Sequence, residues 1–272
     1  MRLRLFFLLP LLFICFFTHA VLVDTIQVKS KVMNKNIFCV VISPDKQING
    51  ASCPVLYLLH GYGGSYKSWL EVKPELPQLA EQYGMMIVCP DGENSWYWDS
   101  PQNSASQFET FVSDELIKYI DQNYPTVPNA AGRAITGLSM GGHGALWLAI
   151  RHQDIFGGAG STSGGLDILP FSKNWKIKEQ LGEQLSNKQI WESHTVINQL
   201  EKLRNGNLMI IIDCGDNDIF FEVNNRVHHK LCTLNIKHDY IVRPGTHNSQ
   251  YWNNSIEYQI LFFAKFFNNK LI

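Results

Sequence analysis

The stretch from Arg133 to Ile150, RAITGLSMGGHGALWLAI, decides how the rest of the chain is arranged. It opens with an apolar, strand-like run and closes with small and apolar residues suited to a helix. Between them stands Gly137-Leu138-Ser139-Met140-Gly141, a G-x-S-x-G turn. Such a turn strains the backbone of its serine, and it needs flanking glycines because a Cβ would collide with the adjoining strand and helix. The pattern predicts strand, sharp turn and helix, with the Ser139 hydroxyl at the top of a sheet.

The same alternation of strands and helices extends along the chain. An antiparallel hairpin is predicted first, over 25–32 and 37–42, from two alternating segments around a turn. After the hairpin, continuous apolar runs alternate with segments whose apolar residues have helical spacing. A continuous apolar run is typical of a strand that is buried on both faces. Strands are expected at 55–59, 85–89, 155–160, 208–212 and 239–242, and helices at 77–83, 107–123, 222–234 and 249–267. This order predicts an α/β fold whose central sheet is mostly parallel and has helices on both faces.

One segment, 161–207, departs from the alternation and breaks into short helical pieces. It would follow the carboxyl end of a strand, where an insertion can form a lid. We call it the insertion. Its two tryptophans, Trp175 and Trp191, are expected to be packing residues.

The N-terminal sequence predicts that the protein is exported. Arg2 and Arg4 precede an apolar run over 5–17, and Ala20 ends it with a small residue at the cleavage position. A membrane anchor is the alternative, but the run is shorter than the ~20 residues that a spanning helix needs, and Pro10 interrupts it. We therefore expect a signal peptide over 1–20, an enzyme domain over 21–272, and a periplasmic or extracellular location without stable membrane insertion.

The amino-acid composition excludes some classes of binding partner. A chain of 272 residues, 45% hydrophobic, is long enough for one sizeable core. With 23 basic and 24 acidic residues the formal net charge is −1, so no bulk attraction to nucleic acid or to an anionic membrane is expected. The sequence says nothing of the oligomeric state.

Cysteines and histidines give no sign of a metal site. The predicted mature chain keeps five cysteines and no CxxC pair, and Cys39, Cys89 and Cys214 lie in or beside strand-like runs, which favours buried thiols. His228 and His229 are adjacent, so they lack the i, i+4 spacing of helical ligands. No metal and no cofactor is expected.

Chemistry is expected in the loops that follow strands, because ligands bind outside the carboxyl ends of an open α/β sheet. A serine nucleophile needs a histidine base, and that base needs a carboxylate to orient it. Of the nine histidines, His247 alone stands in a short loop after the last strand, downstream of both the serine and the candidate acids. His60 and His143 come too early in the chain for the base and are expected to be structural.

The acid has three candidates in one loop. Asp213 ends its strand and is expected to tie down the loop, which leaves Asp216 and Asp218. Spacing alone does not separate these two. The oxyanion hole is expected to use the backbone N–H of Met140, which follows the serine, and one N–H from the glycine-rich loop 61–64.

Taken together, the motifs resemble the secreted putative-esterase branch of the α/β hydrolases, which includes feruloyl and acetylxylan esterases, S-formylglutathione hydrolases and mycolyltransferases. The resemblance covers the predicted mature chain through LYLLHGYGG, CPDG, SWYWDSP, GLSMGGHGAL, DCGDNDIFFEVN and RPGTHNSQYW. It implies that Ser139 is the nucleophile, Asp218 the acid and His247 the base. It also implies that Tyr62 and Met140 supply the oxyanion N–H groups. Asn248-Ser249 departs from the family, where an aromatic often follows the histidine.

The resemblance implies a serine carboxylesterase that works through an acyl-enzyme, with acetyl or feruloyl esters of plant polysaccharide as the expected substrates. Acyl transfer by the same triad and S-formylglutathione thioester hydrolysis are the enzymatic alternatives, and a non-catalytic carbohydrate-binding protein is a third. The loop 91–100 carries three aromatic residues, and we call it the aromatic loop. In it, Trp98 and Asp99 either contact the substrate or anchor the loop. We expect substrate contact from these two residues.

Overall fold

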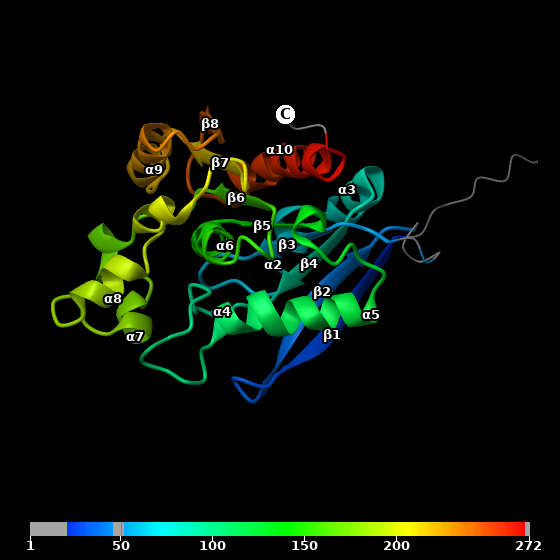
Figure 1. Cartoon of the computed structure of the whole chain (residues 1–272), viewed down its shortest axis with the longest axis horizontal. Helices are drawn as coiled ribbons and strands as arrows, with labels where there is room; N and C mark the ends of the chain where they lie inside the picture. Colours follow the sequence, from blue (N-terminus) through cyan, green and yellow to red (C-terminus); the bar gives the residue numbers. More distant parts are fainter. Residues whose placement is uncertain (1–20, 46–49, 51, 270–272) are drawn as a thin grey trace, which may run out of the picture.

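A computed structural model describes residues 21–45, 50 and 52–269, which lie around one central sheet (Figure 1). The predicted signal peptide, 1–20, lies outside these residues. Within them the sheet has eight strands in the order β1-β2-β4-β3-β5-β6-β7-β8. The strands are β1 (Leu22–Ser30), β2 (Lys35–Ser43), β3 (Val55–Leu59), β4 (Met86–Pro90), β5 (Arg133–Gly137), β6 (Gly158–Thr162), β7 (Met209–Gly215) and β8 (Asp239–Arg243).

Strand direction follows the prediction. β1 and β2 form the antiparallel hairpin, with Ile26 opposite Cys39, and β2 continues antiparallel onto β4. From β4 to β8 every neighbouring pair is parallel. The carboxyl ends of the parallel strands therefore meet at one edge, where the loops after β3, β5, β7 and β8 come together.

Helices cover both faces of the sheet, as expected. On β3, Val55, Tyr57 and Leu59 point into one apolar layer, while Leu56 and Leu58 point into the other. The first layer contains residues of the helices from α4 to α9, and the second contains residues of α2, α3 and α10. The α-helices are α2 (Ser68–Val72), α3 (Leu76–Tyr83), α4 (Phe108–Thr110), α5 (Ile117–Asn123), α6 (Met140–Arg151), α7 (Ile177–Leu181), α8 (Lys188–Ser193), α9 (Phe221–Thr233) and α10 (Ser249–Phe267).

Two expected elements differ in detail. The helix expected over 107–123 contains a π-helical segment, η1 (Phe111–Leu116), between α4 and α5. The strand expected over 155–160 begins later, because the His152 carbonyl accepts the N–H groups of Ile155 and Phe156 and so prolongs the turn after α6. As a result β6 extends to Thr162, and the insertion starts two residues later than expected.

The insertion forms a lobe of short helices beside the sheet, on the left of Figure 1. It contains α7, α8 and the 3₁₀ turns η3 (Leu169–Phe171), η4 (Val196–Asn198) and η5 (Leu200–Lys202), and a further turn, η2 (Ala130–Gly132), precedes β5. A backbone hydrogen bond from Ile197 N–H to the Leu166 carbonyl (3.0 Å) closes the lobe on itself. No helix within the described residues is long and apolar enough to cross a membrane.

Burial confirms the expectation for three cysteines. Cys39, Cys89 and Cys214 are buried, and burial raises the pKa of each thiol well above its ordinary value. Such thiols stay protonated and unreactive at neutral pH. Cys232 is exposed instead.

The aromatic loop that follows β4 is held against α6 by a buried cluster. Trp98 is fully buried, stacks on Trp96 (ring centroids 5.5 Å apart) and donates its indole N–H to His143 Nε2 (3.2 Å). His143 donates its Nδ1–H to the Gly165 carbonyl (2.9 Å). Both ring nitrogens of His143 are therefore used by a neutral imidazole, which supports the structural role expected for this residue.

Because His143 is neutral in the folded protein, stability should depend on acid pH. A histidine in an unfolded chain titrates near pH 6.5, whereas burial lowers the pKa of His143 to about 4. Between these values the unfolded state binds more protons. The contribution of His143 is therefore complete above about pH 6.5 and falls as the pH drops toward 4, by up to about 1.4 kcal/mol per pH unit.

Urea unfolding at pH 7, 6 and 5 measures how steeply the free energy of unfolding falls as the pH is lowered. The His143→Gln variant, whose amide can still donate to the Gly165 carbonyl, should show a shallower slope, whereas a change of the exposed His229 to Ala should leave the slope unaltered. Equal slopes in the parent and in His143→Gln would contradict the assignment. A direct NMR titration of the His143 ring provides a check that does not depend on the variant's stability.

Candidate active site

The serine turn adopts the strained geometry expected from its sequence. Ser139 has φ 55° and ψ −116°, between the end of β5 and the first residue of α6. A Cβ on Gly137 would lie 2.6 Å from the Leu59 carbonyl oxygen, and one on Gly141 would lie 2.4 Å from the same atom. Both positions thus exclude any side chain. The Ser139 N–H donates to the Thr162 carbonyl (2.9 Å), which fixes the apex against the end of β6.

His247 and Asp218 meet Ser139 from two other loops. His247 Nε2 lies 3.0 Å from Ser139 Oγ, and His247 Nδ1 lies 3.0 Å from both carboxylate oxygens of Asp218. The Asp218 side chain is fully buried and also accepts the N–H of Phe220 (2.8 Å). The rings of Phe220 and Trp252 contact the His247 ring edge-on, with centroids 5.3 and 5.0 Å away. The three polar side chains therefore form one hydrogen-bonded chain.

The structure also separates the candidate acids. Asp213 is buried, accepts the Tyr251 hydroxyl (2.6 Å) and pairs with Arg243 (2.5 Å), so it ties the end of β7 to its neighbours. Asp216 accepts the N–H of Gly245 (3.1 Å) and so joins the two loops. Of the three, Asp218 is the one that contacts His247.

The glycine-rich loop after β3 lies beside Ser139. Its turn is closed by a hydrogen bond from Gly64 N–H to the Gly61 carbonyl (3.0 Å), and Gly63 N–H donates to Asn94 Oδ1 (2.7 Å). His60 is buried at the base of this loop, where its Nδ1–H donates to the Gly61 carbonyl (2.7 Å) and its Nε2 accepts the Gly92 N–H (2.8 Å). His60 thus fixes the loop, as a structural histidine would.

The two residues expected to supply the oxyanion-hole N–H groups are Tyr62, in the glycine-rich loop, and Met140, directly after Ser139. Tyr62 belongs to the glycine-rich loop and lines the cavity in front of Ser139. Met140 is the first residue of α6, and the N–H groups of a first helical turn have no acceptor within the helix. The N–H of Met140 is therefore available to a ligand at the helix N-terminus.

A cavity of about 420 Å³ opens in front of Ser139 and His247. Its lining includes the glycine-rich loop and Ser139, together with the large apolar side chains of Trp175 and Trp252. Glu71, an exposed residue of α2, stands among the polar lining residues. Sequence reasoning missed Trp252 and Glu71, and it assigned Trp175 to packing. In the structure Trp175 packs on Phe220 (5.1 Å between centroids) and lines the cavity as well.

The expectation of substrate contact from Trp98 and Asp99 does not fit their positions. Trp98 is fully buried against His143, and Asp99 accepts both the N–H and the hydroxyl of Thr110 (2.9 and 2.5 Å) at the start of the following helix. Neither residue lines the cavity. Both anchor the aromatic loop, because Trp98 is bonded to His143 on α6 and Asp99 to Thr110 on α4.

The cavity lining offers no cluster of metal ligands, but a group lies elsewhere. Among the described residues, His228, Cys232 and His238 bring one ligand atom each to within 4.8 Å of the others. The spacing of His228 and His229 gave no sign of this group, but His228 and Cys232 form an i, i+4 pair on α9 that the sequence already contains. His238 could not be added from the sequence, because only the folded structure shows that the chain reverses after α9 and places His238 beside the helix.

Comparison with known proteins agrees with this architecture. The acetyl esterase of Caldicellulosiruptor saccharolyticus is 27% identical over 250 residues, which cover 84% of this chain and 92% of that protein. The diacylglycerol acyltransferase/mycolyltransferase Ag85A of Mycobacterium gordonae is 32% identical over 216 residues, which cover 71% of this chain and 60% of that protein. A solved ferulic acid esterase superposes with a TM-score of 0.79 and 26% identity, over 92% of this chain and 99% of that one.

These relatives confirm the expected α/β-hydrolase fold and agree with ester hydrolysis or acyl transfer as the reaction class. The model of the family described as "Putative esterase" matches residues 30–263, which is most of the chain. The chain therefore belongs to the putative-esterase family of α/β hydrolases.

Proposed function

We propose that the chain is a serine carboxylesterase that hydrolyses acyl esters of carbohydrates through an acyl-enzyme on Ser139. The observation that carries the proposal is the hydrogen-bonded series Asp218, His247, Ser139, of which His247 and Ser139 line the cavity. A serine hydroxyl is a weak nucleophile alone, and a histidine base oriented by a buried carboxylate is the arrangement that activates it.

In the first half of the reaction, Ser139 Oγ attacks the ester carbonyl while His247 Nε2 takes the serine proton. Asp218 accepts the Nδ1–H of His247, which fixes the tautomer and stabilises the imidazolium. The negative charge that develops on the carbonyl oxygen is stabilised by the N–H groups of Tyr62 and Met140. His247 then donates its proton to the departing alcohol, leaving the acyl group on Ser139.

In the second half, His247 takes a proton from water, which attacks the acyl group. The new bond joins the water oxygen to the acyl carbon, and the bond to Ser139 Oγ breaks as His247 returns the proton to the serine. The carboxylic acid product leaves and the free enzyme is restored. If a sugar hydroxyl replaces water in this step, the same residues perform acyl transfer.

Substrate class is inferred from the cavity and from the relatives. A volume of about 420 Å³ exceeds what an acetyl group alone would fill, and the indoles of Trp175 and Trp252 offer flat apolar surface. Such surfaces suit a sugar ring or a feruloyl group. The similar proteins include an acetyl esterase and a ferulic acid esterase. We therefore propose acetyl or feruloyl esters of plant polysaccharide, reached after export and removal of residues 1–20.

Substitution of Ser139 or Asp218 should remove most of the esterase activity. We expect Ser139→Ala to lower kcat by about 10⁶-fold, since it removes the nucleophile. Asp218→Asn should lower kcat by about 10⁴-fold, since an amide no longer holds the reactive His247 tautomer. Hydrolysis of 4-nitrophenyl acetate, with circular dichroism to verify folding, measures both effects. Asp216→Asn is the matched control in the same loop and should retain activity. Equal losses in Asp216→Asn and Asp218→Asn would refute the assignment of the acid.

Trp175 should affect binding more than chemistry, because its ring lines the cavity without touching the triad atoms described above. We expect Trp175→Ala to raise KM for a feruloyl ester by roughly tenfold, the range for losing about 1–2 kcal/mol of aromatic contact, with kcat little changed. Trp175→Phe should restore most of the affinity. A fall in kcat at unchanged KM would contradict this role.

Product analysis on polysaccharide tests the substrate class. The purified protein should release acetate or ferulate from xylan, and Ser139→Ala should release neither. Activity confined to short soluble esters would count against the carbohydrate assignment while leaving the esterase mechanism intact. Addition of a sugar acceptor distinguishes the two reactions, since acyl transfer would yield an acylated sugar in place of free acid.

A further inference from the structure

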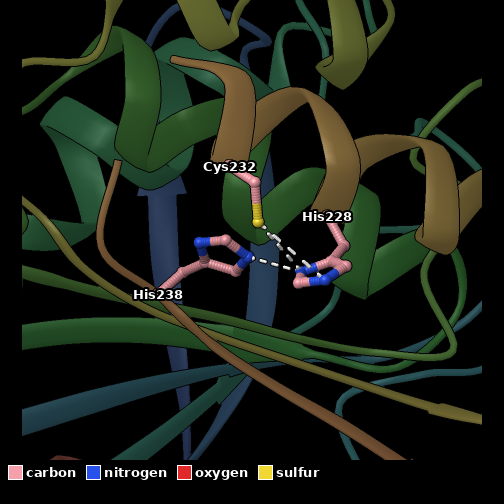
Figure 2. A group of neighbouring side chains, drawn as sticks. All are labelled: His228, Cys232 and His238. Atoms are coloured by element: carbon pink, nitrogen blue, oxygen red, sulfur yellow. Dashed lines mark hydrogen bonds between the residues drawn. The ribbon is translucent and has the colours of Figure 1, made fainter. Parts of the chain in front are cut away.

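A group of three potential metal ligands lies where α9 packs beside the start of β8. His228 and Cys232 stand four residues apart on α9, hence on one face of the helix, and His238 directly precedes β8 (Figure 2). Figure 2 shows the three side chains directed toward one another from α9 and from the loop that precedes β8. None of the three has a role in the hydrolytic site.

The distances between the ligand atoms suit a tetrahedral ion. His228 Nδ1 lies 2.8 Å from His238 Nε2, and Cys232 Sγ lies 3.9 Å from His228 Nδ1. Around tetrahedral zinc, bonds of about 2.0–2.1 Å to nitrogen and 2.3 Å to sulfur place two nitrogens about 3.3 Å apart, and nitrogen and sulfur about 3.6 Å apart. Zinc would require the two nitrogens to move apart by about half an ångström. Cys232 Sγ, which lies 3.9 Å from both ring nitrogens of His228 and within 4.8 Å of the other ligand atoms, would move closer to them from its exposed position.

Hydrogen bonding prepares His238 to be a ligand. Its Nδ1 lies 2.8 Å from the Ile236 carbonyl, which can only accept, so Nδ1 carries the proton. The Nε2 of His238 is then unprotonated, and its lone pair accepts the Nδ1–H of His228. A carbonyl that fixes the far nitrogen of an imidazole is the outer-shell contact usual for a metal-binding histidine.

His228 is held in place by its surroundings. Its ring stacks on Tyr240 (4.4 Å between centroids, 18° between planes), and the Tyr240 hydroxyl donates to Asn225 (2.6 Å). These contacts hold the His228 ring in the position where its Nδ1 faces His238 Nε2.

We propose that Cys232 Sγ, His228 Nδ1 and His238 Nε2 bind one Zn²⁺ ion, with water in the fourth position. A thiolate with two imidazoles selects a borderline-soft cation such as zinc and disfavours magnesium or calcium. On binding, the Cys232 thiol releases its proton to solvent, and the proton of His228 moves from Nδ1 to Nε2. No redox step is involved.

The proposed ion would connect the two elements that lead to the catalytic acid and base. α9 begins three residues after Asp218, and β8 ends four residues before His247. Zinc would link the carboxyl-terminal part of α9, through His228 and Cys232, to the start of β8, through His238. Because none of the three ligands belongs to the hydrogen-bonded group of Ser139, His247 and Asp218, the ion is expected to affect stability and not the chemical step.

Zinc protection of the exposed thiol tests the site directly. The full chain, purified without a histidine tag, is reacted with a thiol reagent under native conditions, with and without Zn²⁺. The difference in modified thiol between the parent and Cys232→Ser isolates Cys232, and Zn²⁺ should suppress that difference. Co²⁺ should give the intense absorption of a tetrahedral thiolate complex. Neither readout depends on esterase activity.

Variants decide whether the three residues act together. Cys232→Ser and His238→Ala should each weaken Zn²⁺ binding by about 100-fold or more, since loss of an outer-shell partner alone costs about 10–100-fold. His229→Ala, an exposed neighbour outside the group, is the matched control and should bind as the parent does. Zn²⁺ should also raise the Tm of the parent and of His229→Ala, but not of Cys232→Ser. Unprotected Cys232, or binding unchanged in Cys232→Ser and His238→Ala, would overturn the proposal.

Discussion

The whole site depends on one steric constraint, the contact between the serine turn and the end of β3. The Leu59 carbonyl approaches both Gly137 and Gly141 so closely that neither can carry a side chain. This contact lets β5 reverse into α6 within a few residues and leaves Ser139 at φ 55°. The strain is sustained because β5 and α6 are buried on all sides. A looser turn would withdraw the hydroxyl from the edge where the other loops converge.

The remaining parts are fixed by burial and by hydrogen bonds between loops. Asp218 has no solvent exposure of its carboxylate, so its interaction with His247 is not screened by water. Asp216 and Asn217 join the loop after β7 to Gly245 in the loop after β8, which fixes the position of Asp218 relative to His247. His60 joins the glycine-rich loop to Gly92 in the same way. The loops that carry Ser139, Asp218 and His247 are therefore positioned by hydrogen bonds that do not involve the cavity.

Much of this could be predicted from the sequence, because strand and helix patterns are local. The order of the elements, the strand direction and the position of Ser139 followed from periodicity and from the turn, and the loop order pointed to His247. Asp216 and Asp218 could not be separated by spacing, since only the bend after Gly215 shows which carboxylate faces the histidine. Trp98 was misplaced for a similar reason: its burial depends on His143, which lies 45 residues away. The cluster of His228, Cys232 and His238 likewise forms only when the chain turns back after α9.

Trp175 comes from the insertion, whereas Ser139, Asp218 and His247 come from the ends of sheet strands and the loops that follow them. The insertion begins and ends on adjacent strands, β6 and β7, so its length can vary without moving either one. The insertion can therefore change in length or composition, and with it the part of the cavity lining that Trp175 supplies, while Ser139, Asp218 and His247 keep their positions. The shape of the cavity and the arrangement of these three residues are thus separable features of the fold.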